Sequence, residues 1–206
     1  MIAPGYEDYA EYVKRQSVTG PVVDRAFEIS QKQFTHYKDT MTETQKPALL
    51  RARGDVLKMA TEGAFNIVVH GCNCFCAMGS GIAAQVRRQY PEAWQVDQET
   101  EAGDYNKLGN YTVMLGKRFN IVNAYTQYKT ASYPGEDVFE YESFALILRK
   151  LARQYPGCDF GLPYIGMGLA GGDVDTIMAM LEDFAQQVAQ TGGTVTLVEF
   201  APETAE

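Results

Sequence analysis

Apolar and polar positions along residues 47–200 follow two kinds of pattern. Residues 66–71 form a continuous apolar run with a turn signal at each end, which is typical of a strand buried on both faces. Residues 141–154 place apolar side chains at helical spacing, namely Phe144, Ile147, Leu148 and Leu151. Strands that alternate with helices in this way predict an α/β layered domain.

The remaining elements are predicted from the same patterns and from the glycines and prolines between them. Further strands are expected at residues 48–53, 111–115, 119–124, 160–165 and 194–200. Further helices are expected at residues 56–61, 82–89, 91–101 and 174–190. No internal repeat or low-complexity segment interrupts them.

The first 46 residues differ from the rest of the chain. They contain two stretches at helical spacing, about residues 6–15 and 22–37, and no strand pattern. The sequence therefore predicts a helical N-terminal extension over 1–46 and a single α/β domain over 47–206.

Composition and charge limit the classes of ligand. The 206 residues are 46% hydrophobic, as in ordinary globular domains, and 26 acidic against 18 basic residues give a formal charge of −8. A protein that binds nucleic acid in bulk or an anionic membrane should lean basic, so neither is expected. A small anion needs only a local nest of backbone N–H groups and stays compatible with this charge.

The chain carries no apolar run near the roughly 20 residues of a membrane span. Its first 15 residues are acidic and mixed, unlike a signal peptide. We therefore expect a cytoplasmic protein.

Three of the four cysteines, Cys72, Cys74 and Cys76, form a C-x-C-x-C run, and the fourth is Cys158. Disulfide frameworks spread their cysteines, and zinc sites prefer C-x(2–4)-C pairs, so reduced thiols without a metal are expected. The run is interpreted as small residues that allow close approach of the backbone. A nucleophilic thiol activated by the following helix N-terminus is the alternative.

Two glycine-rich loops carry the main functional signal. Each follows a buried-looking strand and opens a helix, the first at residues 71–81 and the second at 166–173. Glycine lets backbone N–H groups crowd an anion, and the helix N-terminus adds a positive dipole end. Neither loop matches the dinucleotide or triphosphatase patterns. Tight strand-to-helix turns are the alternative reading of one loop, but two such loops together favour a shared diphosphate site.

The chain resembles the macrodomains, which bind ADP-ribose, over about residues 50–200. The matching motifs occur in the family's order: Arg53-Gly54-Asp55-Val56, Val68-Val69-His70-Gly71-Cys72-Asn73, Met78-Gly79-Ser80-Gly81-Ile82-Ala83, and Gly161-Leu162-Pro163-Tyr164-Ile165-Gly166-Met167-Gly168-Leu169-Ala170-Gly171-Gly172-Asp173. The resemblance implies a three-layer fold with a mixed sheet of about six strands and helices on both faces. It is closest to the branch with G-x-G-I-A and G-x-G-L loops.

The resemblance also implies a ligand site for ADP-ribose without a further cofactor. Asp55, with Val56, would contact the adenine, and Asn73 the distal ribose. The loops would wrap the diphosphate and distal ribose through Gly79, Ser80, Gly81, Ile82, Ala83, Gly166, Met167, Gly168, Leu169, Ala170 and Gly171. Tyr125 would stack on adenine or ribose. The alternatives are that Asp55 caps a helix and that Asn73 satisfies its own turn.

The catalytic signal is weaker. Two hydrolytic branches of the family use an aspartate in the first loop, or a lysine with an aspartate, and the matching residues here are Ala83, Ala124 and Ala170. The remaining candidates are Asn73 for positioning, and His70 and Asp173 for acid–base work. A core role for His70 and a helix cap for Asp173 are the alternatives.

We therefore expect the chain to bind ADP-ribose and to hydrolyse a small derivative such as ADP-ribose 1″-phosphate. Removal of ADP-ribose from modified protein or nucleic acid is one alternative. A non-catalytic reader of ADP-ribosylated partners is the other.

Overall fold

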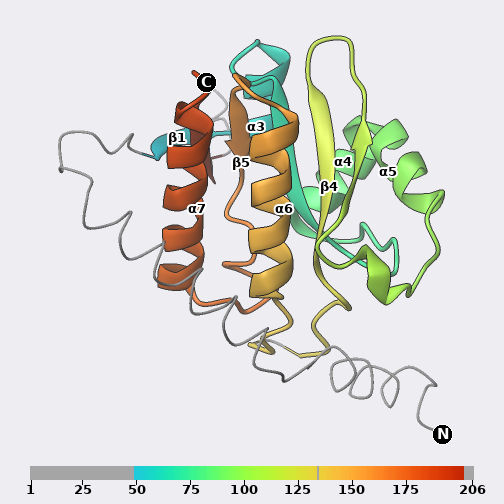
Figure 1. The fold of residues 1–206 in the computed structure, drawn as a ribbon. Coiled ribbons are helices and arrows are strands. Elements are labelled where there is room, and N and C mark those ends of the chain that lie inside the picture. Colours follow the sequence, from blue (N-terminus) through green and yellow to red (C-terminus); the bar gives the residue numbers. More distant parts are fainter. Residues whose placement is uncertain (1–48, 134, 202–206) are drawn as a thin grey trace, which may run out of the picture. The chain divides into compact units, whose positions relative to one another are not determined.

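The computed structural model describes residues 49–133 and 135–201. Within them six strands form one sheet in the order β1-β6-β5-β2-β4-β3 (Figure 1). The strands are β1 (Leu50–Gly54), β2 (Ile67–Asn73), β3 (Tyr111–Met114), β4 (Asn120–Gln127), β5 (Phe160–Leu162) and β6 (Val195–Phe200). All neighbours are parallel except β3 and β4.

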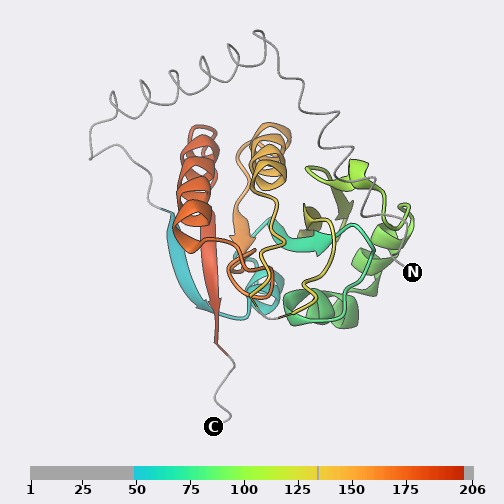
Figure 2. The same ribbon diagram turned by 90° about the horizontal axis from the view of Figure 1, so that it is seen from below.

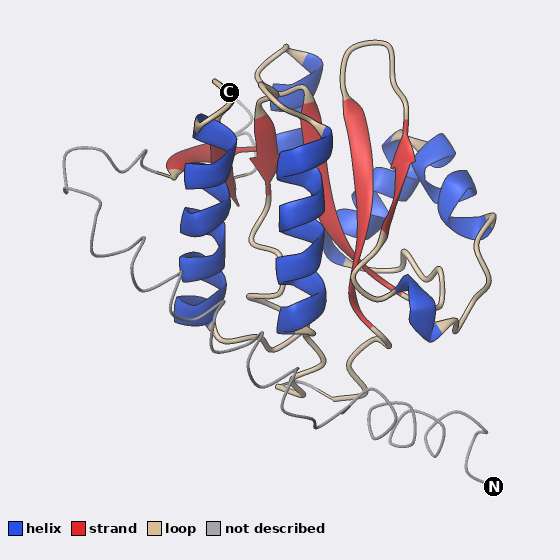
Figure 3. Cartoon of the chain, in the orientation of Figure 1, coloured by secondary structure: helices blue, strands red, loops and turns tan. Residues whose placement is uncertain are grey.

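Helices cover both faces of the sheet (Figure 3). They are α3 (Val56–Thr61), α4 (Gly81–Gln89), α5 (Pro91–Gln98), α6 (Tyr141–Gln154) and α7 (Val174–Ala189), with a short 3-10 helix η2 (Tyr105–Lys107). Figure 2 shows α6 and α7 on one side of the sheet, with α3 and α4 on the other. The predicted mixed sheet with two helical layers is confirmed. The helices expected at 6–15 and 22–37 lie outside the described residues.

Two apolar cores fill the spaces between these layers. One joins α6 and α7 to the sheet through residues such as Phe144, Leu151 and Phe184. The other joins α3, α4 and α5 to the opposite face through residues such as Leu57 and Val86. None of the described helices combines the length and the apolar character needed to cross a lipid bilayer.

Most predicted elements are present, and their ends differ. β2 and β4 pair in parallel as far as Asn73 and Gln127, so residues predicted to begin loops extend both strands instead. β5 ends at Leu162, before Pro163, which has no N–H to donate to a ladder. α5 ends at Gln98, where the Thr100 hydroxyl donates to the carbonyl oxygen of Asp97.

The strand order brings the two glycine-rich loops together. They follow β2 and β5, which are neighbours in the sheet and run in the same direction. Because the carboxyl ends of parallel strands meet at one edge, both loops lie at the end of the sheet that Figure 2 faces.

Candidate functional site

An open cavity of about 710 Å³ lies at the carboxyl ends of β2, β4 and β5. The first glycine loop and the start of α4 form one wall, and the second glycine loop forms another. The strand ends and the segment after β4 complete it. The lining residues are Gly71, Asn73, Ala77, Ser80, Gly81, Ile82, Ala83, Thr126, Gln127, Thr130, Ala131, Ser132, Tyr133, Gly135, Pro163, Tyr164, Ile165, Gly166, Gly168, Leu169 and Ala170.

The N-terminus of α4 faces this cavity without a side-chain cap. Ser80 occupies the N-cap position, and its hydroxyl makes no capping hydrogen bond. The first α4 residue whose backbone N–H donates to a carbonyl oxygen is Ala84, which donates to that of Ser80 at 3.1 Å. By contrast, Asp55 caps α3 and Asp173 caps α7. Among the described residues, the α4 terminus therefore presents open N–H groups and a positive dipole end to the cavity.

The second glycine loop has a backbone that only glycine tolerates at two positions. Gly166 and Gly171 have φ values of +79° and +73°. A Cβ on Gly166 would lie 2.5 Å from the Phe139 ring, and one on Gly171 would lie 2.5 Å from the carbonyl oxygen of Glu136. A Cβ on Gly168 would meet no atom within 4 Å. This loop packs tightly on its outer side and is open toward the cavity.

The chemistry of the cavity wall favours an anion bound by backbone groups. Among the described residues that line it, none is aspartate, glutamate, lysine, arginine, histidine or cysteine. Within the described chain, the amides of residues 167–170 also donate to no protein acceptor. Two loops with open N–H groups on neighbouring walls are suited to a phosphate or diphosphate.

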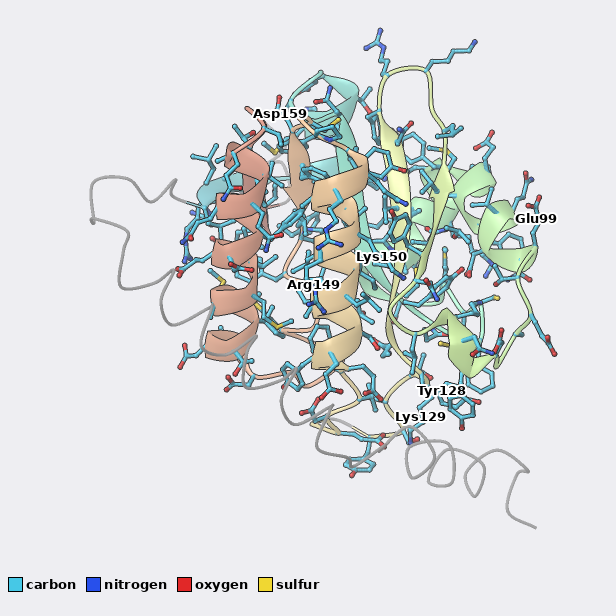
Figure 4. The ribbon with its side chains drawn as sticks, viewed as in Figure 1. Glu99, Tyr128, Lys129, Arg149, Lys150 and Asp159 are labelled. Carbon is cyan, nitrogen blue, oxygen red and sulfur yellow. The ribbon has the colours of Figure 1, made fainter. Side chains whose placement is uncertain are left out.

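The segment after β4 forms a third wall that the sequence did not reveal. Lys129, labelled in Figure 4, places its Nζ 2.7 Å from Oε1 of Glu136. The other carboxylate oxygen of Glu136 accepts from the backbone N–H of Ser132 at 2.6 Å. The hydrogen bond from Lys129, together with that from Ser132, lowers the pKa of Glu136. Val138 donates to the carbonyl of Ala170, which ties this wall to the second loop.

Asp55 and Val56 lie outside the cavity lining, at the end of β1. The Asp55 carboxylate accepts from the amides of Leu57 and Lys58 at 2.8 and 3.3 Å, as the helix-cap alternative expects. Val56 is buried. Phe200, the last residue of β6, is paired with Gly54 and is 59% exposed. Phe200 is therefore an exposed aromatic residue on β6, opposite the β1 residue that precedes Asp55.

Asn73 lines the cavity, but its amide group holds the first loop in shape. Its Nδ2 donates to the carbonyl of Ala77 at 2.8 Å. Its Oδ1 accepts from the amides of Phe75 and Ala77 at 2.9 and 3.4 Å. The structure thus gives Asn73 the turn-stabilising role at a position that also borders the cavity.

The other sequence candidates lie away from the cavity lining. His70 is fully buried, with Nε2 2.8 Å from Oδ1 of Asn123. Tyr125 is buried with its hydroxyl donating to Asp97 at 2.8 Å, so its ring offers no stacking surface there. Asp173 caps α7 through the Thr176 amide. Three loop residues are also absent from the lining, namely Gly79, Met167 and Gly171.

Burial of His70 makes the stability of the fold depend on pH. Burial lowers the pKa of His70, so the folded protein holds it neutral where the unfolded chain, with a pKa near 6.5, already binds a proton. Its contribution to stability is present above about pH 6.5 and is lost as the pH falls toward the folded pKa, at up to about 1.4 kcal/mol per pH unit.

We expect His70→Gln to remove this part of the pH dependence, measured by urea unfolding between pH 7.5 and 5.5. Comparison with the wild type cancels the contribution of the other histidine. Equal pH profiles for both proteins would contradict a buried, neutral His70.

No family model matches the chain. One sequence relative is an uncharacterized 17.5 kDa protein from the tk-vs intergenic region of Enterobacteria phage T4. It is 32% identical over 152 residues, which cover 66% of this chain and 89% of the phage protein.

Solved structures show the same fold at lower sequence identity. The macrodomain of Thermus aquaticus DarG is 20% identical with a TM-score of 0.54, over 75% of this chain and 99% of that one. Thermosipho africanus DarTG, solved with ADP-ribose, is 14% identical with a TM-score of 0.57, over 77% of this chain and 43% of that one. The Trypanosoma brucei macrodomain, also solved with ADP-ribose, is 12% identical with a TM-score of 0.51, over 73% of this chain and 62% of that one.

Proposed function

Because this chain belongs to the family of the 17.5 kDa phage T4 protein and has the macrodomain fold, we propose that its cavity binds ADP-ribose. The observation that carries the proposal is the uncapped N-terminus of α4, which opens into a cavity shared with a second glycine loop. The volume of about 710 Å³ lies within the range of roughly 300–1,000 Å³ for small-molecule sites.

The diphosphate is assigned to the two glycine loops. The open amides of Gly81, Ile82 and Ala83 approach it from α4, and those of Gly168, Leu169 and Ala170 approach it from the second loop. Within the described lining these contacts involve no cationic side chain, which is consistent with an acidic chain that holds an anion. Two solved structures that share this fold, Thermosipho africanus DarTG and the Trypanosoma brucei macrodomain, were determined in complex with ADP-ribose, which supports the same ligand here.

The adenine is assigned to the carboxyl ends of β1 and β6, on the β1 side of the sheet. Asp55 offers a carboxylate to the exocyclic amine, and the exposed ring of Phe200 offers a stacking surface. The distal ribose then lies at the carboxyl ends of β2 and β4, near Asn73, Thr126 and Gln127.

The two roles of Asp55 can be separated by substitution. Asp55→Ser keeps a helix-capping side chain but removes the carboxylate from the adenine. We expect this variant to weaken ADP-ribose about tenfold and to leave ribose 5-phosphate affinity nearly unchanged, measured by titration calorimetry. Asp55→Ala serves as the comparison because it also loses the cap. Equal losses for both ligands would mean that Asp55 acts through the fold alone.

A second candidate function is hydrolysis of ADP-ribose 1″-phosphate. Thr126 and Gln127 favour it because they add a hydroxyl and an amide to the cavity beside Asn73, and such groups can orient a water molecule. The described lining offers no carboxylate, lysine or histidine as a base. The proton acceptor in this scheme is therefore the phosphate of the substrate.

Turnover assays separate the candidate functions. Phosphate release from ADP-ribose 1″-phosphate supports hydrolysis of this small molecule. Release of ADP-ribose from modified protein or nucleic acid supports an enzyme that removes ADP-ribose from macromolecules. Binding of ADP-ribose without turnover of any of these substrates supports a reader. The described lining residues include no acid–base side chain, which supports a reader more than it supports hydrolysis of ADP-ribose 1″-phosphate.

A further inference from the structure

Beneath the first glycine loop lies a buried polar cluster that ADP-ribose binding does not use. Its centre is Lys107, whose Nζ lies 3.0 Å from Sγ of Cys76, 2.5 Å from Oγ1 of Thr100 and 3.5 Å from Oδ1 of Asp97. Lys107, Cys76 and Asp97 are 6%, 7% and 0% exposed. A buried ammonium therefore contacts a thiol directly.

Cys76 differs from its neighbours in the C-x-C-x-C run. Burial raises the pKa of Cys74 to about 12 and raises the pKa of Cys72 well above its ordinary value, so both stay protonated thiols. Among the described contacts of these three cysteines, the hydrogen bond from an ammonium belongs to Cys76. An ammonium interacts more favourably with a thiolate than with a thiol, and the thiolate is the form that peroxides oxidise.

The backbone holds Cys76 in this position. Its φ of +57° is unusual for a residue with a side chain, and its carbonyl accepts from Nε2 of Gln98 at 3.0 Å. The Lys107 side chain also packs over the ring of Tyr125, with Nζ 4.4 Å from the ring centroid. Sulfur and nitrogen are thus fixed close to each other by contacts on both sides.

We propose that Cys76 and Lys107 form a covalent sulfur–nitrogen cross-link when a hydroperoxide oxidises the protein. The Cys76 thiolate first attacks the peroxide, the O–O bond breaks, and a sulfenic acid forms as sulfur loses two electrons. The hydroxide that leaves takes one proton from the Lys107 ammonium. The resulting amine attacks sulfur, the S–O bond breaks, and the hydroxyl leaves as water with a second proton of the nitrogen. Thiolate, ammonium and hydrogen peroxide thereby give one S–N bond and two waters.

The cross-link changes the surroundings of the ligand cavity. It joins the first glycine loop to η2, and it consumes the positive charge that faces the buried Asp97 carboxylate. Oδ2 of Asp97 already has no hydrogen-bond partner within the described structure. Oxidation at this pair would therefore act on the loop that carries Ala77 and Ser80 into the cavity.

Mass spectrometry of the full chain after hydrogen peroxide treatment tests the cross-link. Trypsin cleaves at Arg87 and Arg88, between the two residues, so a cross-link joins two peptides that otherwise separate. We expect a linked pair that has lost two hydrogens, blocks cleavage at Lys107, and is released by dithiothreitol. Cys158→Ser is the matched control and should give the same linked pair.

Lys107→Arg and Cys76→Ser should each give no linked pair, and the first should instead carry further oxidation at Cys76. Wild-type protein in which Cys76 carries only sulfinic or sulfonic acid, or forms a disulfide with Cys74, would overturn the proposal. The wild-type result alone decides the question if either variant fails to fold. It does not depend on whether the cavity binds ADP-ribose.

Discussion

Replacing Ser80 with aspartate is expected to reduce ADP-ribose affinity about a hundredfold or more while stabilising the free protein. Ser80 is the N-cap of α4 and leaves the first amides of the helix open. An aspartate there would accept from these amides and place a negative charge where we propose that the diphosphate binds. Two like charges about 4 Å apart near a protein surface repel by about 4 kcal/mol.

Ser80→Asp is expected to weaken ADP-ribose binding and to stabilise the free protein. General damage to the fold would lower stability and therefore would not produce both effects. The cap should raise the free energy of unfolding by about 0.5–1 kcal/mol, measured by urea denaturation. Ser80→Asn is the matched control because it caps the helix without a charge, and it should lose less affinity. If Ser80→Asp bound ADP-ribose as tightly as the wild type, the assignment of the diphosphate to the α4 terminus would be wrong.

A valine at Gly168 is expected to block the cavity without disturbing the fold. A Cβ at this position meets no protein atom within 4 Å, and Gly168 lines the cavity. The free energy of unfolding should therefore stay within about 0.5 kcal/mol of the wild type. ADP-ribose affinity should fall at least tenfold, because the side chain would occupy space assigned to the ligand and crowd its approach to the loop amides.

The smaller Gly168→Ala substitution provides the control for Gly168→Val and should give an intermediate loss of affinity. Calorimetry and thermal unfolding measure the two effects in each variant. A valine variant that is stable and binds ADP-ribose normally would show that the ligand does not contact the second loop.

The sequence predicted the parts of the site that depend on local pattern. The apolar run before Gly71 and the predicted strand at 160–165 indicate buried strands, and the glycines after them indicate turns into helices. Because neighbouring parallel strands end at one edge of the sheet, these local signals were enough to place both loops at one site. The dual position of Asp55, at a strand end and a helix start, was also readable from its neighbours.

Contacts between distant segments account for what the sequence did not predict. The wall at 130–133 and 135 depends on the Lys129–Glu136 ion pair and on the hydrogen bond from Val138 to Ala170, neither of which has a periodic signature. The burial of His70 depends on Asn123, which lies 53 residues away in sequence. The burial of Tyr125 likewise depends on a distant partner, because its hydroxyl donates to Asp97, 28 residues away in sequence. Such pairings appear only once the chain has folded.

Titration calorimetry of the purified chain with ADP-ribose tests the central claim most directly. Binding through both glycine loops predicts a dissociation constant on the order of micromolar, about −8 kcal/mol, and much weaker binding of AMP, which leaves the distal ribose site empty. The absence of both heat and thermal stabilisation at millimolar ADP-ribose would contradict the claim that this cavity is an ADP-ribose site.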